Sequence, residues 1–161
     1  MENIFPTIVD NTSGLANMLR TAMGEPSNLC NINPNITPEG FKLSRSGVWE
    51  ICLELAPYLD WETQEKAAER LISLGYTLEN TGELTAFLTD KPDEVEKYSM
   101  VSALGEDSRW MDLDGYVHTP YASVERKVRC FRLYRFDRHL FSNCRVLVSR
   151  QARSFVWPLC V

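Results

Sequence analysis

The segment from Asp60 to Leu88, DWETQEKAAERLISLGYTLENTGELTAFL, decides the fold that the sequence predicts. Its first half has the spacing of an amphipathic helix, because apolar residues recur at intervals of three and four. Asp60 suits the N-cap of this helix, and Gly75 suits the position just after its end. The residues expected on its buried side are Ala67, Ala68, Leu71 and Ile72.

The second half of the segment predicts a β-hairpin. Tyr76–Glu79 and Glu83–Leu88 have the composition of short strands. Asn80–Gly82 lies between them and has the composition of a turn. The chain is therefore expected to pass directly from a helix into two antiparallel strands.

Residues 44–59, just upstream, predict another helix. Ser44 and Ser46 are near its expected start, and Pro57 is expected to end or kink it. Its apolar stripe, in which Cys52 is expected to be a core residue, consists of Val48, Ile51, Cys52, Leu55 and Leu59.

The order of these elements over residues 44–89 is helix, kinked turn, helix and hairpin, and in this it resembles a winged helix-turn-helix domain. The passage from Leu71 to Tyr76 is similar to that family's junction between helix and wing. The resemblance rests on the order of elements and implies DNA binding. The residues oppose that function, because the helix expected in the major groove carries three glutamates and the expected wing, with Glu79 and Glu83, has no base. Phosphates would repel such a surface, so we expect the unit to contact protein.

The remaining chain adds one helix before this unit and mostly strands after it. Leu15, Met18, Leu19 and Ala22 have helical spacing, and residues 25–40 have the composition of an irregular connection. Further expected elements are a helix from Pro92 and strands at 116–118, 128–136 and 144–148. Residues 154–161 are expected to form an edge strand or a segment packed against the rest of the protein.

The fold class that follows is α+β, with a helical N-terminal two-thirds that includes the winged-helix-like unit and then a C-terminal antiparallel β-sheet. We expect residues 1–43, 44–89 and 90–161 to be its three parts, within one compact domain. No apolar run approaches the length of a membrane span, and the N-terminus lacks the pattern of a signal peptide. Five cysteines without regular spacing also favour a reducing compartment, so a cytoplasmic protein is expected.

The charges are distributed unevenly along the chain. Although the net charge is −5, residues 1–122 carry −12 and residues 123–161 carry +7, and eight of the nine bases in this last part are arginines. Three interpretations follow: the two halves pair within the molecule, the arginines bind phosphate, or one charged surface binds a protein of opposite charge.

Catalytic and metal-binding patterns are weak. His118, Cys130, His139 and Cys144 are separated by 11, 8 and 4 residues, so none forms the close pair typical of a zinc site. We therefore expect no metal and no cofactor. A cysteine-dependent hydrolase or transferase, with Cys30 beside His118 or His139, remains the second alternative.

The function that the sequence favours is non-catalytic. We expect an inhibitor or regulator whose acidic surface occupies a basic site on a partner protein, including a site that normally binds nucleic acid. Anti-CRISPR, anti-restriction and immunity proteins have this size and charge character. The predicted contact residues are Glu62, Glu65, Glu69, Asp93, Glu94 and Glu96. The first alternative is a nucleic-acid-binding regulator, in which arginines alternate with aromatic residues as on surfaces that bind single strands. Its predicted contact residues are Arg129, Arg132, Arg135 and Arg138.

Overall fold

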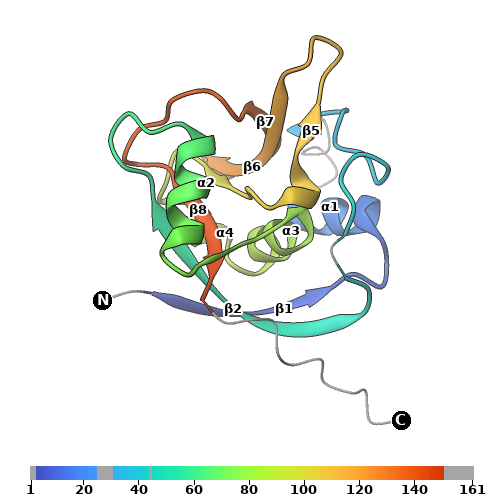
Figure 1. Cartoon of the computed structure of the whole chain (residues 1–161). Coiled ribbons are helices and arrows are strands. Elements are labelled where there is room, and N and C mark those ends of the chain that lie inside the picture. The colour runs from blue at the N-terminus through green and yellow to red at the C-terminus, as the bar shows by residue number, and fades with distance from the viewer. Residues whose placement is uncertain (1–2, 25–30, 44, 151–161) are drawn as a thin grey trace.

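The computed structural model describes residues 3–24, 31–43 and 45–150. In this part of the chain the fold is mixed α/β, with four α-helices and one eight-stranded sheet (Figure 1). The helices are α1 (Leu15–Met23), α2 (Gln64–Ser73), α3 (Thr81–Asp90) and α4 (Pro92–Glu96), and a 3-10 turn spans Glu106–Ser108. The strands are β1 (Ile4–Asp10), β2 (Val48–Pro57), β3 (Thr77–Leu78), β4 (Val101–Ser102), β5 (Trp110–Met111), β6 (Val117–Glu125), β7 (Val128–Arg135) and β8 (Arg145–Ser149).

The sheet joins both ends of the described chain. Its order is β1-β2-β8-β4-β6-β5, while β3 also pairs with β8 and β7 with β6. All pairs are antiparallel except β4 with β8. In Figure 1, β1 and β2 run along the bottom of the molecule, and β5, β6 and β7 lie at the opposite side. The C-terminal strand β8 is thus central, with the N-terminal strands beside it.

The helix predicted over residues 44–59 is wrong, because Val48–Pro57 is strand β2. The alternation of Trp49, Ile51 and Leu53, which are buried, with Glu50 and Cys52, which are exposed, is the period-two pattern of a strand with one buried face. The apolar stripe from which the helix was predicted, Val48, Ile51, Cys52, Leu55 and Leu59, shares only Ile51 with this buried row, and its helical spacing was misleading. The prediction that Cys52 belongs to the core is wrong for the same reason.

The hairpin predicted at residues 76–88 is also wrong. Thr77–Leu78 is strand β3, but it pairs with β8, and the second predicted strand lies within helix α3. Both glutamates expected on an exposed wing, Glu79 and Glu83, are fully buried. Because α3 is buried on nearly all sides, its sequence lacks the polar face that normally reveals a helix.

Because residues 48–57 form a strand and the predicted hairpin does not form, the winged-helix-like unit predicted at residues 44–89 is wrong. The predicted fold class is wrong as well. Strands β1 and β2 lie in the N-terminal third and β3 in the middle of the chain, so the N-terminal two-thirds is not helical. The sheet is not a separate C-terminal layer, since β8 pairs with both β2 and β3.

Several other predictions are confirmed. Helix α1 ends before Gly24, helix α2 buries Ala67, Ala68 and Leu71, and α4 has Pro92 in its first turn. Strands β7 and β8 occupy the segments expected for them, although Ile72, predicted on the buried side of α2, is exposed. The edge strand or packed segment predicted at residues 154–161 lies outside the described residues. Arg153, one of the eight arginines in residues 123–161, also lies outside them.

Two apolar clusters form the core. The larger one packs α1 and α3 against the inner faces of β1 and β2, and Phe87 of α3 contacts Phe5 edge to face at 5.5 Å between ring centroids. The smaller one lies under α2 and includes Leu71, Leu104 and Val146. In the described part of the chain no helix has the length and apolarity needed to span a membrane.

Candidate functional site

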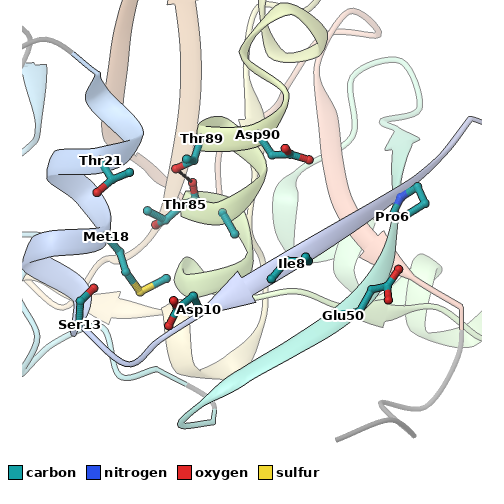
Figure 2. Close-up of a pocket in the computed structure, with 11 residues that line it drawn as sticks. Pro6, Ile8, Asp10, Ser13, Met18, Thr21, Glu50, Thr85, Thr89 and Asp90 are labelled. Carbon is teal, nitrogen blue, oxygen red and sulfur yellow. Dashed lines mark hydrogen bonds between the residues drawn. The ribbon is translucent and has the colours of Figure 1, made fainter. Parts of the chain in front are cut away.

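A groove opens beside β1, between this strand and the exposed sides of α1 and α3 (Figure 2). Its volume is about 510 Å³. We call it the β1 groove, and its lining residues are Pro6, Ile8, Asp10, Ser13, Met18, Thr21, Glu50, Thr85, Ala86, Thr89 and Asp90. Figure 2 shows Asp10, Ser13 and Met18 at the end of the groove where β1 stops.

The strand that borders the groove is the edge of the sheet, because β1 pairs only with β2 within the described residues. The Asn11 N–H donates to the Gly47 carbonyl at 2.9 Å, in the same register as the β1–β2 pairing. Since hydrogen-bonding direction alternates along a strand, the odd-numbered residues of β1 bond to β2. Even-numbered residues, including Ile8, therefore turn their backbone groups to the open edge. Pro6 fits there, because the position needs no N–H donor.

Three carboxylates line the β1 groove, one each from β1, β2 and α3. The Thr12 hydroxyl and backbone N–H both donate to Asp10 and lower the pKa of its carboxyl, which keeps it charged. Glu50 lies opposite Ile8 and is exposed. Asp90 is at the end of α3, where the Lys91 ammonium lies 3.6 Å from its carboxylate. None of the described groove-lining residues is basic.

The threonine hydroxyls in the β1 groove add further acceptors. Thr21, Thr85 and Thr89 each donate to the carbonyl four residues earlier in their own helix. Their donor capacity is thus used within the helix. Thr85 is buried, whereas Thr21 and Thr89 are exposed, so the remaining lone pairs of these two hydroxyls are available to a ligand. A surface of carboxylates and hydroxyl oxygens is suited to cations and to N–H donors.

The predicted acidic contacts on α2 and just before it divide into two kinds. Glu62 is bound by both Nε and Nη2 of Arg70, at 2.8 and 2.9 Å. Burial would raise the pKa of Glu62, but the hydrogen bonds from Arg70 and from the Leu59 N–H outweigh it and lower that pKa. Glu65 and Glu69 are exposed and make no ion pair within the described residues. Only these last two present free charge to a partner.

The predicted contacts on α4 divide in the same way. Glu94 pairs with Lys97 at 2.8 Å, and Glu96 pairs with Lys127 at 2.9 Å. Asp93 is exposed without an ion pair in the described part of the chain. Helix α2 packs against β3, whereas α4 packs against β6 and α3, so the structure does not join the six residues into one cluster.

The four predicted arginines do not form a single row. Arg129 donates to the Ala22 carbonyl at the end of α1 at 2.8 Å, and Arg135 holds Asp137 with two hydrogen bonds. Arg132 is exposed beside Tyr121, on the opposite face of β7 from Arg129 and Arg135. Arg138 is exposed in the turn that follows. The phenyl and phenol rings between them are partly or fully buried.

The residues considered for catalysis and metal binding lie apart. Cys30 is outside the described residues. His118 bonds to Asp112 at 2.8 Å, whereas His139 stacks on Trp61. Cys130 and Cys144 are buried, and burial raises the pKa of the Cys144 thiol. Among the described residues no cysteine is hydrogen bonded to a histidine, and no three histidine, cysteine or acidic side chains gather as metal ligands.

Sequence reasoning missed the β1 groove, because Asp10, Glu50 and Asp90 come from three distant segments. The usable signal was the run of aromatic and β-branched residues Ile4, Phe5, Thr7, Ile8 and Val9. That pattern is typical of a strand, and Pro6 within it indicates an edge. Comparison with protein-family models, curated proteins and solved structures finds no match for this chain.

Proposed function

We propose that this protein is a non-catalytic cytoplasmic inhibitor or regulator that binds a basic site on a partner protein through its acidic surface. The activity would resemble that of anti-CRISPR, anti-restriction and immunity proteins in its use of negative charge. It requires neither a cofactor nor a metal.

The observation that carries this proposal is that several basic side chains contact other parts of the molecule, whereas several acidic side chains are exposed. Several arginines of the C-terminal part act inside the fold: Arg129 binds a helix carbonyl, Arg145 lies over the Tyr98 ring and Arg150 pairs with Glu54. In contrast, Glu65, Glu69 and Asp93 are exposed, as are the carboxylates of the β1 groove. Arg132 and Arg138 are exposed as well, but the contacts that Arg129, Arg145 and Arg150 make within the molecule leave acidic charge on the outside.

An outward negative field has a physical consequence for association. It accelerates encounter with a positively charged site and opposes binding of nucleic acid to the same surface. The three free cysteines that the structure describes, Cys52, Cys130 and Cys144, are compatible with a reducing compartment.

The test compares the native chain with the charge-reversal variant Glu65→Lys/Glu69→Lys/Asp93→Lys. Each is used to capture partners from a lysate of the source cells, with and without nuclease, and the captured protein is purified. We expect a basic partner that survives nuclease, that an oligonucleotide displaces, and that the variant binds at least about tenfold more weakly.

The matched control is Glu65→Asp/Glu69→Asp/Asp93→Glu, which keeps each charge and should bind as the native chain does. The opposite result is direct binding of a labelled oligonucleotide to the chain, with affinity that falls steeply with salt. Loss of that binding in Arg132→Glu/Arg138→Glu would establish the nucleic-acid-binding alternative in place of the proposal.

A further inference from the structure

We propose that the β1 groove binds an extended basic segment of a partner protein, which adds to the sheet as a new strand beside β1. This inference rests on the proposed function, because it specifies how and where a basic partner is held. It assigns the groove a peptide ligand with alternating cationic and small apolar side chains.

The first argument is the open edge of the sheet. Ile8 turns both its N–H and its carbonyl to the β1 groove, and Pro6 adds a second carbonyl. Edge strands are usually protected by lysines, prolines, bulges or covering segments. Strand β1 has one of these features, Pro6, but no lysine, and Ile4 and Ile8 are 56% and 68% exposed. Because Pro6 removes only its own N–H and Ile8 keeps both backbone groups, the part of the edge around Ile8 is a template for strand addition.

The second argument concerns the side chains that an added strand would meet. On the outer face of the sheet, Ile8 lies beside Glu50, and Asp10 follows at the end of β1. On the inner side the groove is bordered by Ala86 of α3 and Met18 of α1. Because side chains alternate across a strand, the ligand would direct lysine or arginine to the carboxylates and small apolar residues toward the helices.

The same charges disfavour the other ligands that could use an open edge. Nucleic acid would bring its phosphates close to Asp10 and Glu50. A second copy of this chain, paired edge to edge, would bring two sets of these carboxylates to one interface. Repulsion between like charges weakens both complexes.

The experiment uses the full chain labelled with nitrogen-15 and a short peptide of alternating lysine and valine. Binding is measured by the movement of backbone amide signals and by hydrogen exchange. We expect the signals of β1, α1 and α3 that border the β1 groove to move, and the Ile8 amide to exchange at least about tenfold more slowly with peptide present.

Two matched reagents separate strand addition from simple attraction of charge. The same peptide with N-methyl groups on alternate backbone nitrogens keeps its charges but cannot pair with a strand edge. The variant Ile8→Pro removes the N–H that faces the groove, whereas Ile8→Val retains it. We expect N-methylation to abolish protection of the residue-8 amide and Ile8→Val to preserve it. Ile8→Pro has no amide at this position, so its readout is the movement of the groove signals, which we expect to be lost. Asp10→Asn/Glu50→Gln/Asp90→Asn should weaken binding about tenfold.

Three results would overturn the inference. One is equal binding of the N-methylated peptide, which would leave only charge attraction. Another is an Ile8 amide already protected without peptide, which would mean that this chain or a second copy occupies the edge. The third is no movement of groove signals although the reversal of Glu65, Glu69 and Asp93 still abolishes capture of the basic partner, which would keep the proposed function and move its site elsewhere.

Discussion

Helices α2 and α3 each contain ten residues, yet they differ in almost every other respect. Helix α2 lies on the surface, with Ala67 and Leu71 buried and Ile72 exposed. Helix α3 crosses the larger core cluster, and seven of its residues are buried. This difference shows that helical periodicity in a sequence reveals a helix with one solvent-exposed face. A helix that is surrounded by protein lacks this periodic pattern of apolar and polar residues.

The N-termini of the two helices differ in the same sense. Helix α2 is capped locally, because the Thr63 hydroxyl accepts from the Lys66 N–H at 3.1 Å. Asn80, at the corresponding position of α3, makes no such bond. Instead the Thr81 N–H donates to the Ser108 hydroxyl at 2.7 Å, from a residue 27 positions away. The N-terminus of α2 is thus stabilised by a residue next to it in the sequence. The N-terminus of α3 is stabilised by a distant residue, which only the completed fold brings close.

The largest expected effect that separates the two helices is that of removing a buried ring. Phe87 is fully buried, so Phe87→Ala should lower the free energy of unfolding by about 3–5 kcal/mol. Ile72→Ala on α2 removes an exposed side chain and should change it by no more than about 0.5 kcal/mol. Urea unfolding followed by circular dichroism measures both values. Similar losses in the two variants would show that α3 is not the more important helix for stability.

A smaller effect should appear where α3 begins. A Cβ placed on Gly105 would overlap with the Asn80 side-chain oxygen, and Asn80 is itself buried. Gly105→Ala should therefore destabilise the protein by about 1–3 kcal/mol, because the asparagine must move within a packed interior.

The double variant Gly105→Ala/Asn80→Ala removes the atom that the new methyl group meets. We expect it to recover most of the loss, which a double-mutant cycle measures as a strong coupling between the two positions. Strictly additive effects would mean that Asn80 is not what limits the space at Gly105.

This contrast also explains how much of the structure was predictable. Helices α1 and α2 and strands β7 and β8 have one buried face or a strong composition, and the sequence located them. Strand β2 was missed because Val48, Ile51, Cys52, Leu55 and Leu59 have helical spacing, and the alternation of Trp49, Ile51 and Leu53 was not considered. Helix α3 was missed because Thr85 and Phe87 favour strands and its burial removed the periodic signal.

The candidate site was less predictable than the fold. The acidic character of the first 122 residues is visible in the sequence, but the pairing that neutralises Glu62, Glu94 and Glu96 is not. Glu62 pairs with Arg70 on the helix that follows it, Glu94 pairs with Lys97 just after its own helix, and Glu96 pairs with Lys127 on a distant turn. The β1 groove depends on the approach of β1, α1 and α3, which only the tertiary structure provides.

The smallest expected effect concerns the ion pair that fixes α2 to the chain before it. Arg70 binds both Glu62 and the Pro57 carbonyl, so its contacts join the end of α2 to residues outside the helix. Because the pair is partly solvated, Arg70→Ala should reduce the free energy of unfolding by only about 1 kcal/mol at neutral pH. Lys66→Ala, on the same helix and without an ion pair among the described residues, is the matched control.

The pH dependence of this loss identifies its cause. Hydrogen bonds from Arg70 and the Leu59 N–H outweigh the effect of burial and lower the pKa of Glu62, so the stability from that shift is present above the unfolded-state pKa of about 4.3. It is lost as the pH falls through the lower folded-state pKa, where Glu62 becomes protonated. The difference between the native chain and Arg70→Ala should therefore shrink in acid, when unfolding is measured in urea at several pH values. A difference that stays constant would show that Arg70 stabilises α2 through the Pro57 carbonyl and its packing, with no contribution from the Glu62 charge.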